Sequence, residues 1–438
     1  MIRDPLAPFE PTAADPFDLA KVGHLLRRAG FQASLAVRRR LARQGLDAAW
    51  AFVTASATDP TTDRWADVVA ALGDVGRVRA HRVWLALSGR APLRHRVSYF
   101  WHGHFATGNQ KILDPRAMAA QQATFDRLGL GRFDELAAAM CRDPALLRWL
   151  DNDVNTDEHP NENFARELFE LFTLGRGHYS EADVREAARC FTGWHVRHGR
   201  FRFVAHRHDG SEKRVFGAEG AFDGDDVLRL TLPRRESAEF LADRWLRWFV
   251  HPEPTADEVA ALADVYQQND RRVGPTLATL LRSRLFFSRR AWRSKVKSPA
   301  DFVVGTVRLL DGRAAPAALA RTMAGLGETW LEPPSVEGWH GERAWLSEAS
   351  WLLRSNFVAD LLAGRAANFA PRPGTLFAGL ERPDHYAKAS ALLLLDDRVA
   401  AEDLQRLEAV AADARGDEDR RAAAVLHAAA CLPDYQLA

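Results

Sequence analysis

The sequence contains little cysteine. Its 438 residues include three, Cys141, Cys190 and Cys431, which lie far apart and form no CxxC pair. Because a disulfide framework needs paired cysteines and a cysteine-based zinc site needs closely spaced ones, neither is expected. We interpret the three residues as buried thiols.

The chain also lacks a long apolar run. No stretch approaches the ~18 residues of a membrane-spanning helix, and the nearest candidate, the leucines at 392–395, is too short. The N-terminus has no basic segment followed by an apolar one, as a secretory signal peptide would have. As written, the sequence therefore predicts a cytoplasmic, soluble protein with no membrane span.

Neither sign of charge is in excess. Lys and Arg number 59 and Asp and Glu number 58, which gives a net charge of +1. A field that would hold nucleic acid or an anionic membrane is not supported, so we expect no nucleic-acid partner. Only six of the basic residues are lysine, and the ordinary explanation for so much arginine is codon bias.

Several familiar catalytic motifs are absent as well. The sequence has no GxSxG nucleophile elbow, no P-loop, no HExxH zinc motif and no Gly-rich dinucleotide fingerprint. These absences argue against the enzyme classes that depend on such motifs.

Helix start signals, in contrast, recur along the chain. Asp114-Pro115 and Asp143-Pro144 each place an N-cap acceptor before a proline at the first helical position. Thr255 and Glu258 have the spacing of a capping box. These signals predict an all-α, multi-helical fold.

The domain organisation follows from the distribution of turn residues. Four prolines indicate an extended arm over residues 1–18, followed by a helical core over 19–370. The turn residues Pro371 to Gly374 mark the boundary of a helical C-terminal segment, 371–438, which we expect to pack on the core.

One short stretch breaks the helical period. The residues from Arg200 to Val204 alternate with period two, and a second short run extends from Lys213 to Phe216. The two runs predict a β-hairpin insertion near 200–217. His208 and Asp209 then lie at its tip, where they could orient a substrate or bind a metal; polar residues also collect at hairpin tips without any function.

His102 and His104 are candidate metal ligands within the segment from Phe100 to Phe105, FWHGHF. On one continuous helix with ~3.6 residues per turn they would point about 200° apart and could not share a metal. A helix end at Gly103 would let the two imidazoles converge. Alternatively, His102 complements the dipole of the helix C-terminus and His104 is a packed loop residue.

A helix is predicted after Pro160, with an apolar core stripe at Phe164, Leu168, Leu171 and Phe172. Glu167 lies at the margin of this stripe, where a partly buried carboxylate needs a cation, a metal or a proton. The alternative to such a site is that the polar face of this helix is an exposed ion-pair ladder, because i, i+4 spacing relates Glu162, Arg166 and Glu170.

A calcium loop is a further candidate at 151–162. The loop positions 1, 3, 5, 7 and 12 are occupied by Asp151, Asp153, Asn155, Asp157 and Glu162. Thr156 replaces the glycine that makes the sharp turn, and Pro160 interrupts the loop. The alternative is a polar turn whose side chains bind backbone groups.

Read together, these motifs resemble the DUF1800 family, a bacterial family of unknown function. The resemblance is carried by His24–Phe31, Phe100–Phe105, Asp114–Arg116, Pro160–Leu168, Glu170–Gly175, Thr192–Trp194, His208-Asp209, Val296–Pro299, Pro333–Val336 with Gly338-Trp339, and Pro433–Gln436. It implies a mostly helical bacterial protein whose motif positions include His102, His104, Asn161, Glu162, Arg166, Glu167 and His208. Members of the family are often exported and often occur beside sulfatase-like proteins, which implies a possible partner of that kind.

Two functions remain open from the sequence. The first is a metal-dependent enzyme, a hydrolase or an oxidoreductase, with zinc, iron or manganese held by His102, His104 and a carboxylate of Glu162 or Glu167. The catalytic candidates are Glu167, Arg166, His208 and Asp209, and Arg166 would pair with an anionic substrate group. The alternative is a non-catalytic helical binding or assembly protein that acts with a partner protein and whose polar motifs fix loop geometry.

Overall fold

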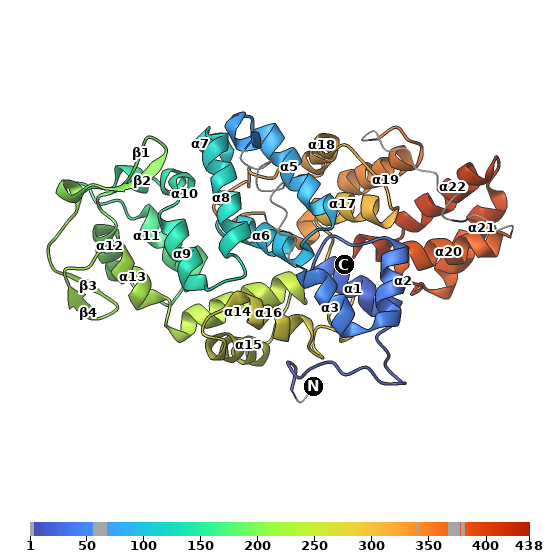
Figure 1. The fold of residues 1–438 in the computed structure, drawn as a ribbon, viewed down its shortest axis with the longest axis horizontal. Coiled ribbons are helices and arrows are strands. Elements are labelled where there is room, and N and C mark those ends of the chain that lie inside the picture. Colours follow the sequence, from blue (N-terminus) through green and yellow to red (C-terminus); the bar gives the residue numbers. More distant parts are fainter. Residues whose placement is uncertain (1–3, 56–67, 340, 367–376, 378–381) are drawn as a thin grey trace.

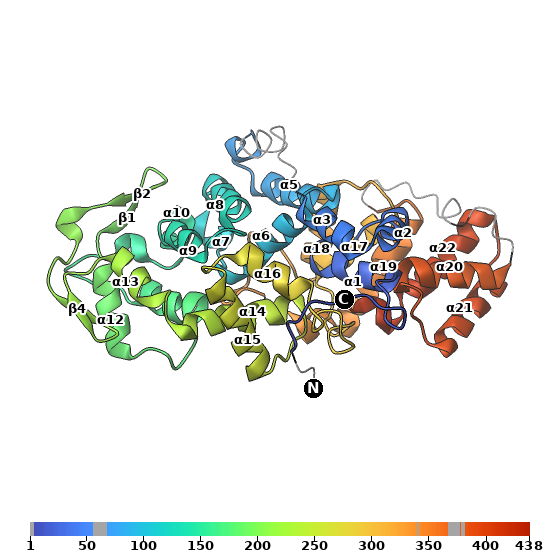
Figure 2. The ribbon, with the colours of Figure 1, turned by 60° about the horizontal axis from the view of Figure 1, so that its bottom comes forward.

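The computed structural model describes residues 4–55, 68–339, 341–366, 377 and 382–438. Nearly all regular structure in these ranges is helical, and the strands form two separate two-stranded sheets. The expected all-α fold with a small β-hairpin insertion is therefore confirmed. The molecule is elongated in both ribbon views (Figure 1, Figure 2). No described helix is both long and apolar enough to cross a membrane.

The first helices lie near the middle of the molecule rather than at one end (Figure 1). They are α1 (Leu19–Arg28), α2 (Leu35–Gln44), α3 (Leu46–Thr54), α5 (Val75–Ser88) and α6 (Pro92–His104). The chain then runs to the left end of Figure 1 through α7 (Asn109–Ile112), α8 (Pro115–Leu128), α9 (Phe133–Cys141), α10 (Pro144–Trp149), η1 (Asn152–Val154), α11 (Asn163–Glu167), η2 (Leu168–Thr173) and α12 (Glu181–Cys190).

The second half of the chain crosses the middle again and ends on the opposite side. It contains η3 (Ala205–Arg207), α13 (Gly224–Thr231), α14 (Arg235–Phe249), α15 (Ala256–Gln268), α16 (Val273–Leu281), α17 (Pro299–Leu309), α18 (Pro316–Gly325), η4 (Glu342–Trp345) and α19 (Glu348–Leu362). The right end of Figure 1 is built from α20 (Pro383–Leu395), α21 (Ala401–Asp413) and α22 (Glu418–Ala430), and η6 (Pro433–Gln436) follows them.

The capping residues act as their sequence positions predict. The Asp114 carboxylate accepts from the backbone N–H groups of Arg116 and Ala117, and Asp143 accepts from that of Leu146. Thr255 and Glu258 form a capping box with both bonds present. Each side chain satisfies backbone donors that the first helical turn leaves without partners.

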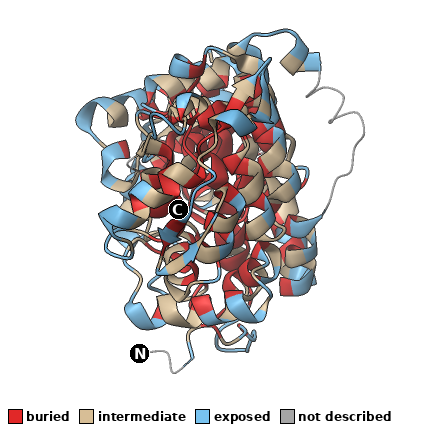
Figure 3. Ribbon diagram, turned by 90° about the vertical axis from the view of Figure 1, so that its left-hand side faces the viewer, coloured by how far each residue is buried: buried red, intermediate tan, exposed pale blue. Residues whose placement is uncertain are grey.

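Among the described residues, the buried hydrophobic side chains form two large cores and one small cluster. The first is assembled from residues between Leu6 and Ala291, and the second mainly from residues between Ala300 and Tyr435. The half-buried ring of Trp248 on α14 packs against both. Figure 3 shows the buried residues running through the interior, surrounded by exposed helix faces.

Helix α6 supplies residues to both cores. Phe100 belongs to the first and Tyr99 to the second, and ten of its 13 residues are buried. The helix continues through Gly103 and ends at His104. The helix thus extends one residue beyond Gly103, the terminator that would let the two imidazoles converge. The Gly103 carbonyl oxygen lies next to Gly338, whose φ is 84°. A Cβ added at Gly338 would lie 2.6 Å from that oxygen.

The expected pairing of the β-hairpin is also wrong. The structure has two hairpins, in which β1 (Trp194–Arg197) pairs with β2 (Arg200–Phe203) and β3 (Lys213–Val215) pairs with β4 (Ala218–Gly220). Both turns have two central residues with positive φ, His198-Gly199 and Phe216-Gly217. This backbone matches the twist of antiparallel strands. His208 and Asp209 consequently lie between the hairpins and not at a tip.

The C-terminal segment packs on residues far away in the sequence. The backbone N–H of Lys297 donates to the Gln436 carbonyl at 2.8 Å, and that of Ala438 donates to Lys295 at 2.8 Å. The second core contains side chains from α17 to α22 together. The expected boundary at 371–374 lies outside the described residues.

One buried carboxylate joins the N-terminal helices to this segment. Asp396, which directly follows α20, is ion-paired with Arg27 of α1 and Arg38 of α2, and its side chain is fully buried. A Cβ at Gly23 would lie 2.3 Å from this carboxylate, so the glycine leaves the space that it needs. The two guanidinium groups offset the cost of burying the charge.

Replacing Asp396 with Asn should therefore destabilise the fold strongly. The substitution leaves Arg27 and Arg38 buried without a counter-charge, which costs about 3–5 kcal/mol in the free energy of unfolding. Urea denaturation measures this loss. The matched control is Asp397→Asn at the exposed neighbouring residue, and equal losses in both variants would contradict the assignment.

Candidate functional site

His102 faces the segment that follows α18. Its Nε2 accepts a hydrogen bond from the Leu331 N–H at 2.9 Å, and its ring packs edge-on against Trp339 with centroids 5.2 Å apart. Burial lowers the pKa of His102 to about 3, and the positive charge of Arg82 lowers it further. The imidazole is therefore neutral, with its proton on Nδ1.

His104 contacts a different segment. Its Nε2 lies 3.0 Å from the Phe172 carbonyl oxygen. Because a carbonyl only accepts, Nε2 must carry the proton and Nδ1 must keep a lone pair. Burial and the nearby Arg244 lower the pKa of His104 well below its usual value. Nδ1 is buried and has no hydrogen-bond partner among the described residues.

The two imidazoles therefore do not converge, since α6 is continuous at Gly103 and their Nε2 atoms contact separate segments. In the described part of the chain, no group of three or more His, Cys, Asp and Glu side chains is arranged to hold a metal. A zinc, iron or manganese ion held by His102, His104, Glu162 or Glu167 stays a prediction.

Arg166 joins two helices at the surface. Its guanidinium lies 2.9 Å from Glu162 and 2.8 Å from Glu181 at the start of α12. Glu170 takes no part in this network, because it binds Arg176 at 2.6 Å and Tyr179 at 3.0 Å. The expected pair of Glu162 with Arg166 is therefore present. The expected pair of Arg166 with Glu170 is replaced by the contacts of Glu170 with Arg176 and Tyr179.

Glu167 is half-buried at the junction of α11 with the π-helical turn η2. It makes no hydrogen bond or ion pair with a described residue. Burial raises its pKa, and the carboxylates of Glu170 and Glu337 raise it further. Single π-helical turns within α-helices are frequent at functional sites. The side chain is thus a candidate proton carrier beside Glu337.

The segment 151–162 forms a hydrogen-bonded turn. The amide group of Asn155 donates to the Ala188 carbonyl at 2.9 Å, and its oxygen accepts from the Asn161 N–H at 2.9 Å. Lys111 is ion-paired with Asp151 at 2.7 Å. These contacts are those of a polar turn; calcium binding stays a prediction.

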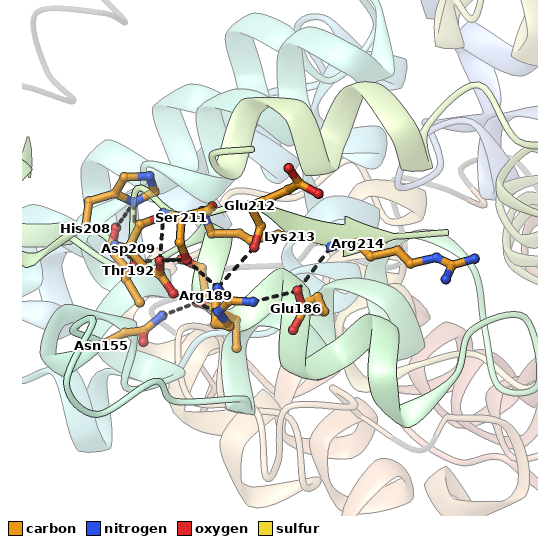
Figure 4. Close-up of polar contacts among 11 residues, drawn as sticks. Asn155, Glu186, Arg189, Thr192, His208, Asp209, Ser211, Glu212, Lys213 and Arg214 are labelled. Atoms are coloured by element: carbon orange, nitrogen blue, oxygen red, sulfur yellow. Dashed lines mark hydrogen bonds and ion pairs between the residues drawn. The ribbon is translucent and has the colours of Figure 1, made fainter. Parts of the chain in front are cut away.

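His208 and Asp209 belong to a network centred on Arg189 (Figure 4). Arg189 Nε donates to Asp209 at 2.7 Å, and Nδ1 of His208 lies 2.9 Å from the Thr192 carbonyl. Burial alone would raise the pKa of Asp209, but the hydrogen bond from Arg189 and those from Ser211 lower it below its ordinary value. These contacts fix the chain between the two hairpins; a catalytic role for the pair stays a prediction.

A cavity of about 280 Å³ lies where α6 and α14 meet the segments 295–301 and 337–345. Its aromatic lining consists of Tyr99, Phe100, Trp248, Trp339 and Trp345. The charged and polar groups among its other lining residues include Arg96, His104, Arg244, Arg247, Lys295, Asp301, Glu337 and Glu342. Apolar walls with a few polar groups are typical of small-molecule sites, which also favour junctions between structural units.

Most charges in this cavity are paired within the protein. Arg96 is ion-paired with Asp301, and its guanidinium also lies 5.0 Å from the Trp248 ring centroid. Lys295 is ion-paired with Glu342. Within each pair the two charges neutralise each other, and the paired side chains form part of the cavity wall.

Arg244 is the exception. It makes no hydrogen bond or ion pair with a described residue, and its guanidinium carbon lies 5.8 Å from the centroid of the Phe240 ring. Burial lowers the pKa of Arg244 from its very high ordinary value, which still leaves it charged at neutral pH. A half-buried, unpaired guanidinium attracts an anion, preferably one with two parallel oxygens.

Tyr99 is held in place by a buried acid. Glu328 accepts from the Tyr99 hydroxyl at 2.5 Å, the Trp330 indole N–H at 2.7 Å and the Ala300 N–H at 2.9 Å. Burial raises the pKa of Glu328 to about 7, although these hydrogen bonds act in the opposite direction. The acid therefore orients one aromatic wall of the cavity.

Part of this site had a sequence signal. The cavity is lined by residues of three sequence motifs, Phe100–Phe105, Val296–Pro299 and Gly338-Trp339. Arg244, Lys295 and Glu342 were missed, because nothing local distinguishes them from the many other charged residues of helices and loops.

The raised pKa of Glu328 predicts a pH dependence of stability. The folded chain keeps the proton on Glu328 up to about pH 7, whereas the unfolded side chain loses it near the ordinary glutamate pKa of 4.5. Stability should therefore fall by up to about 3 kcal/mol as pH rises through this window, and then level off. Glu328→Gln has no such titration, so its denaturation curves should lack the slope. Exposed Glu348→Gln is the control, and parallel pH profiles for wild type and Glu328→Gln would refute the assignment.

Comparison with known proteins gives one result. A family model described as "Protein of unknown function (DUF1800)" matches residues 24–437. No curated protein and no solved structure matches the chain.

Proposed function

The chain belongs to the DUF1800 family, and we propose that it binds a small organic anion in the cavity between α6 and α14. The observation that carries this proposal is Arg244, which lines an aromatic cavity and makes no hydrogen bond or ion pair with a described residue. An anionic group of the ligand would pair with Arg244, and its apolar or planar part would lie against the tryptophan rings.

A second group supports a ligand at the same place. His104 also lines the cavity, and its buried Nδ1 lone pair has no partner in the part of the chain that the structure describes. A buried acceptor without a hydrogen bond costs free energy, which a ligand donor would recover. The neutral imidazole would accept a hydrogen bond or a proton from the ligand, so the arrangement supports an enzyme as well as a binding protein.

Benzoate is a suitable probe, since it combines a carboxylate with a planar apolar ring. Isothermal titration calorimetry should show one benzoate site per chain. Arg244→Gln should weaken binding at least about tenfold, because a hydrogen-bonded charge pair is lost.

Arg229→Gln is the matched control, since Arg229 is exposed on α13 and pairs with Asp226 away from the cavity. It should bind benzoate as the wild type does. Absence of binding by the wild type, or equal affinity in Arg244→Gln, would overturn the proposal.

A further inference from the structure

Lys295 gives the cavity a second kind of chemistry. It is one of six lysines in the chain, and its side chain is 13% exposed where it lines the cavity. Its Nζ donates to the Arg247 carbonyl at 2.6 Å and is paired with Glu342. An amine in this position lies beside a carboxylate that can exchange protons with it.

The charges around Lys295 favour its neutral form more than is usual for lysine. Burial lowers the pKa of Lys295 to about 8 against the opposing effect of Glu342, and the positive charges of Arg28 and Arg96 lower it further. About a tenth of the amines are then neutral at pH 7 and about half at pH 8. Desolvation and neighbouring cations activate lysine nucleophiles in the same way.

We propose that Lys295 forms a reversible imine with a carbonyl compound that also carries an anionic group. This inference rests on the proposed anion site, because Arg244 would hold the anionic group while Lys295 reacts with the carbonyl carbon. The substrate class is therefore an oxo acid or an aldehyde acid, with a flat or apolar part that suits the tryptophan walls.

The reaction needs no further reagent. Glu342 takes a proton from the Lys295 ammonium group, and the Nζ lone pair attacks the carbonyl carbon. The carbonyl oxygen becomes a hydroxyl group with a proton from the amine. Protonation by Glu342 then releases this hydroxyl as water while the C=N bond forms, so that one water leaves for each imine and no atom is oxidised or reduced.

The other lysines provide internal controls. Lys297 is two residues away, but its side chain is buried. Its Nζ donates a hydrogen bond to the Tyr435 carbonyl and lies 3.6 Å from the centroid of the Tyr435 ring. Lys111 and Lys388 have exposed side chains and report the background reaction. Lys295 alone among these four lysines lines the cavity.

The test uses 4-carboxybenzaldehyde, which combines an aldehyde, a carboxylate and a ring. Cyanoborohydride reduces the imine to a stable secondary amine, and peptide mapping by mass spectrometry locates it. Lys295 should be labelled at least about tenfold faster than Lys111 or Lys388, with a rate that rises through pH 8. Excess benzoate should suppress this fast labelling, and benzaldehyde, which has no carboxylate, should react with Lys295 more slowly.

Two variants separate fast from background labelling. Lys295→Arg keeps a cation beside Glu342 and should lose the fast phase, whereas Lys111→Arg should keep it. Labelling of Lys295 no faster than that of Lys111 overturns the imine proposal. If benzoate still binds in that case, the anion site stands without the imine; if it does not bind, both proposals fail.

Discussion

The burial of α6 on all sides is the constraint on which the rest of the structure depends. A helix surrounded by protein must satisfy each of its polar side chains inside the fold. Successive turns of α6 therefore bind different segments through Arg96 with Asp301, Tyr99 with Glu328, Trp101 with the Gly129 carbonyl, His102 with Leu331 and His104 with Phe172. These contacts position the two cores relative to each other and leave the cavity at their junction.

Residues of the same type have different roles in this arrangement. His102 uses its Nε2 on the Leu331 backbone and positions the segment that carries Trp339. His104, half a turn further along, lines the cavity, and its Nδ1 has no hydrogen-bond partner among the described residues. Asp209 and Arg166 satisfy their charges within the protein, whereas Arg244 does not. The two histidines thus differ in which segment and which cavity their rings face, and not in residue type.

The sequence predicted the local structure better than the site. Asp114 and Asp143 mark helix starts because capping is a contact over a few residues. The expected pairing of the runs at 200–204 and 213–216 is wrong because each run pairs within its own hairpin, the first through the turn at His198-Gly199. Gly103 lies one residue before the end of α6, and a difference of one residue is finer than sequence patterns resolve. Arg244 could not be found at all, since its lack of an ion pair with any described residue depends on what folds around it.

The central claim is that the cavity at α6 and α14 binds an organic anion. A crystal structure of the protein with 4-iodobenzoate tests this most directly, because the iodine atom locates the ligand by its anomalous signal. The account predicts the carboxylate at the Arg244 guanidinium and the iodinated ring among Trp248, Trp339 and Trp345. A ligand bound only elsewhere, with this cavity filled by solvent, would contradict it.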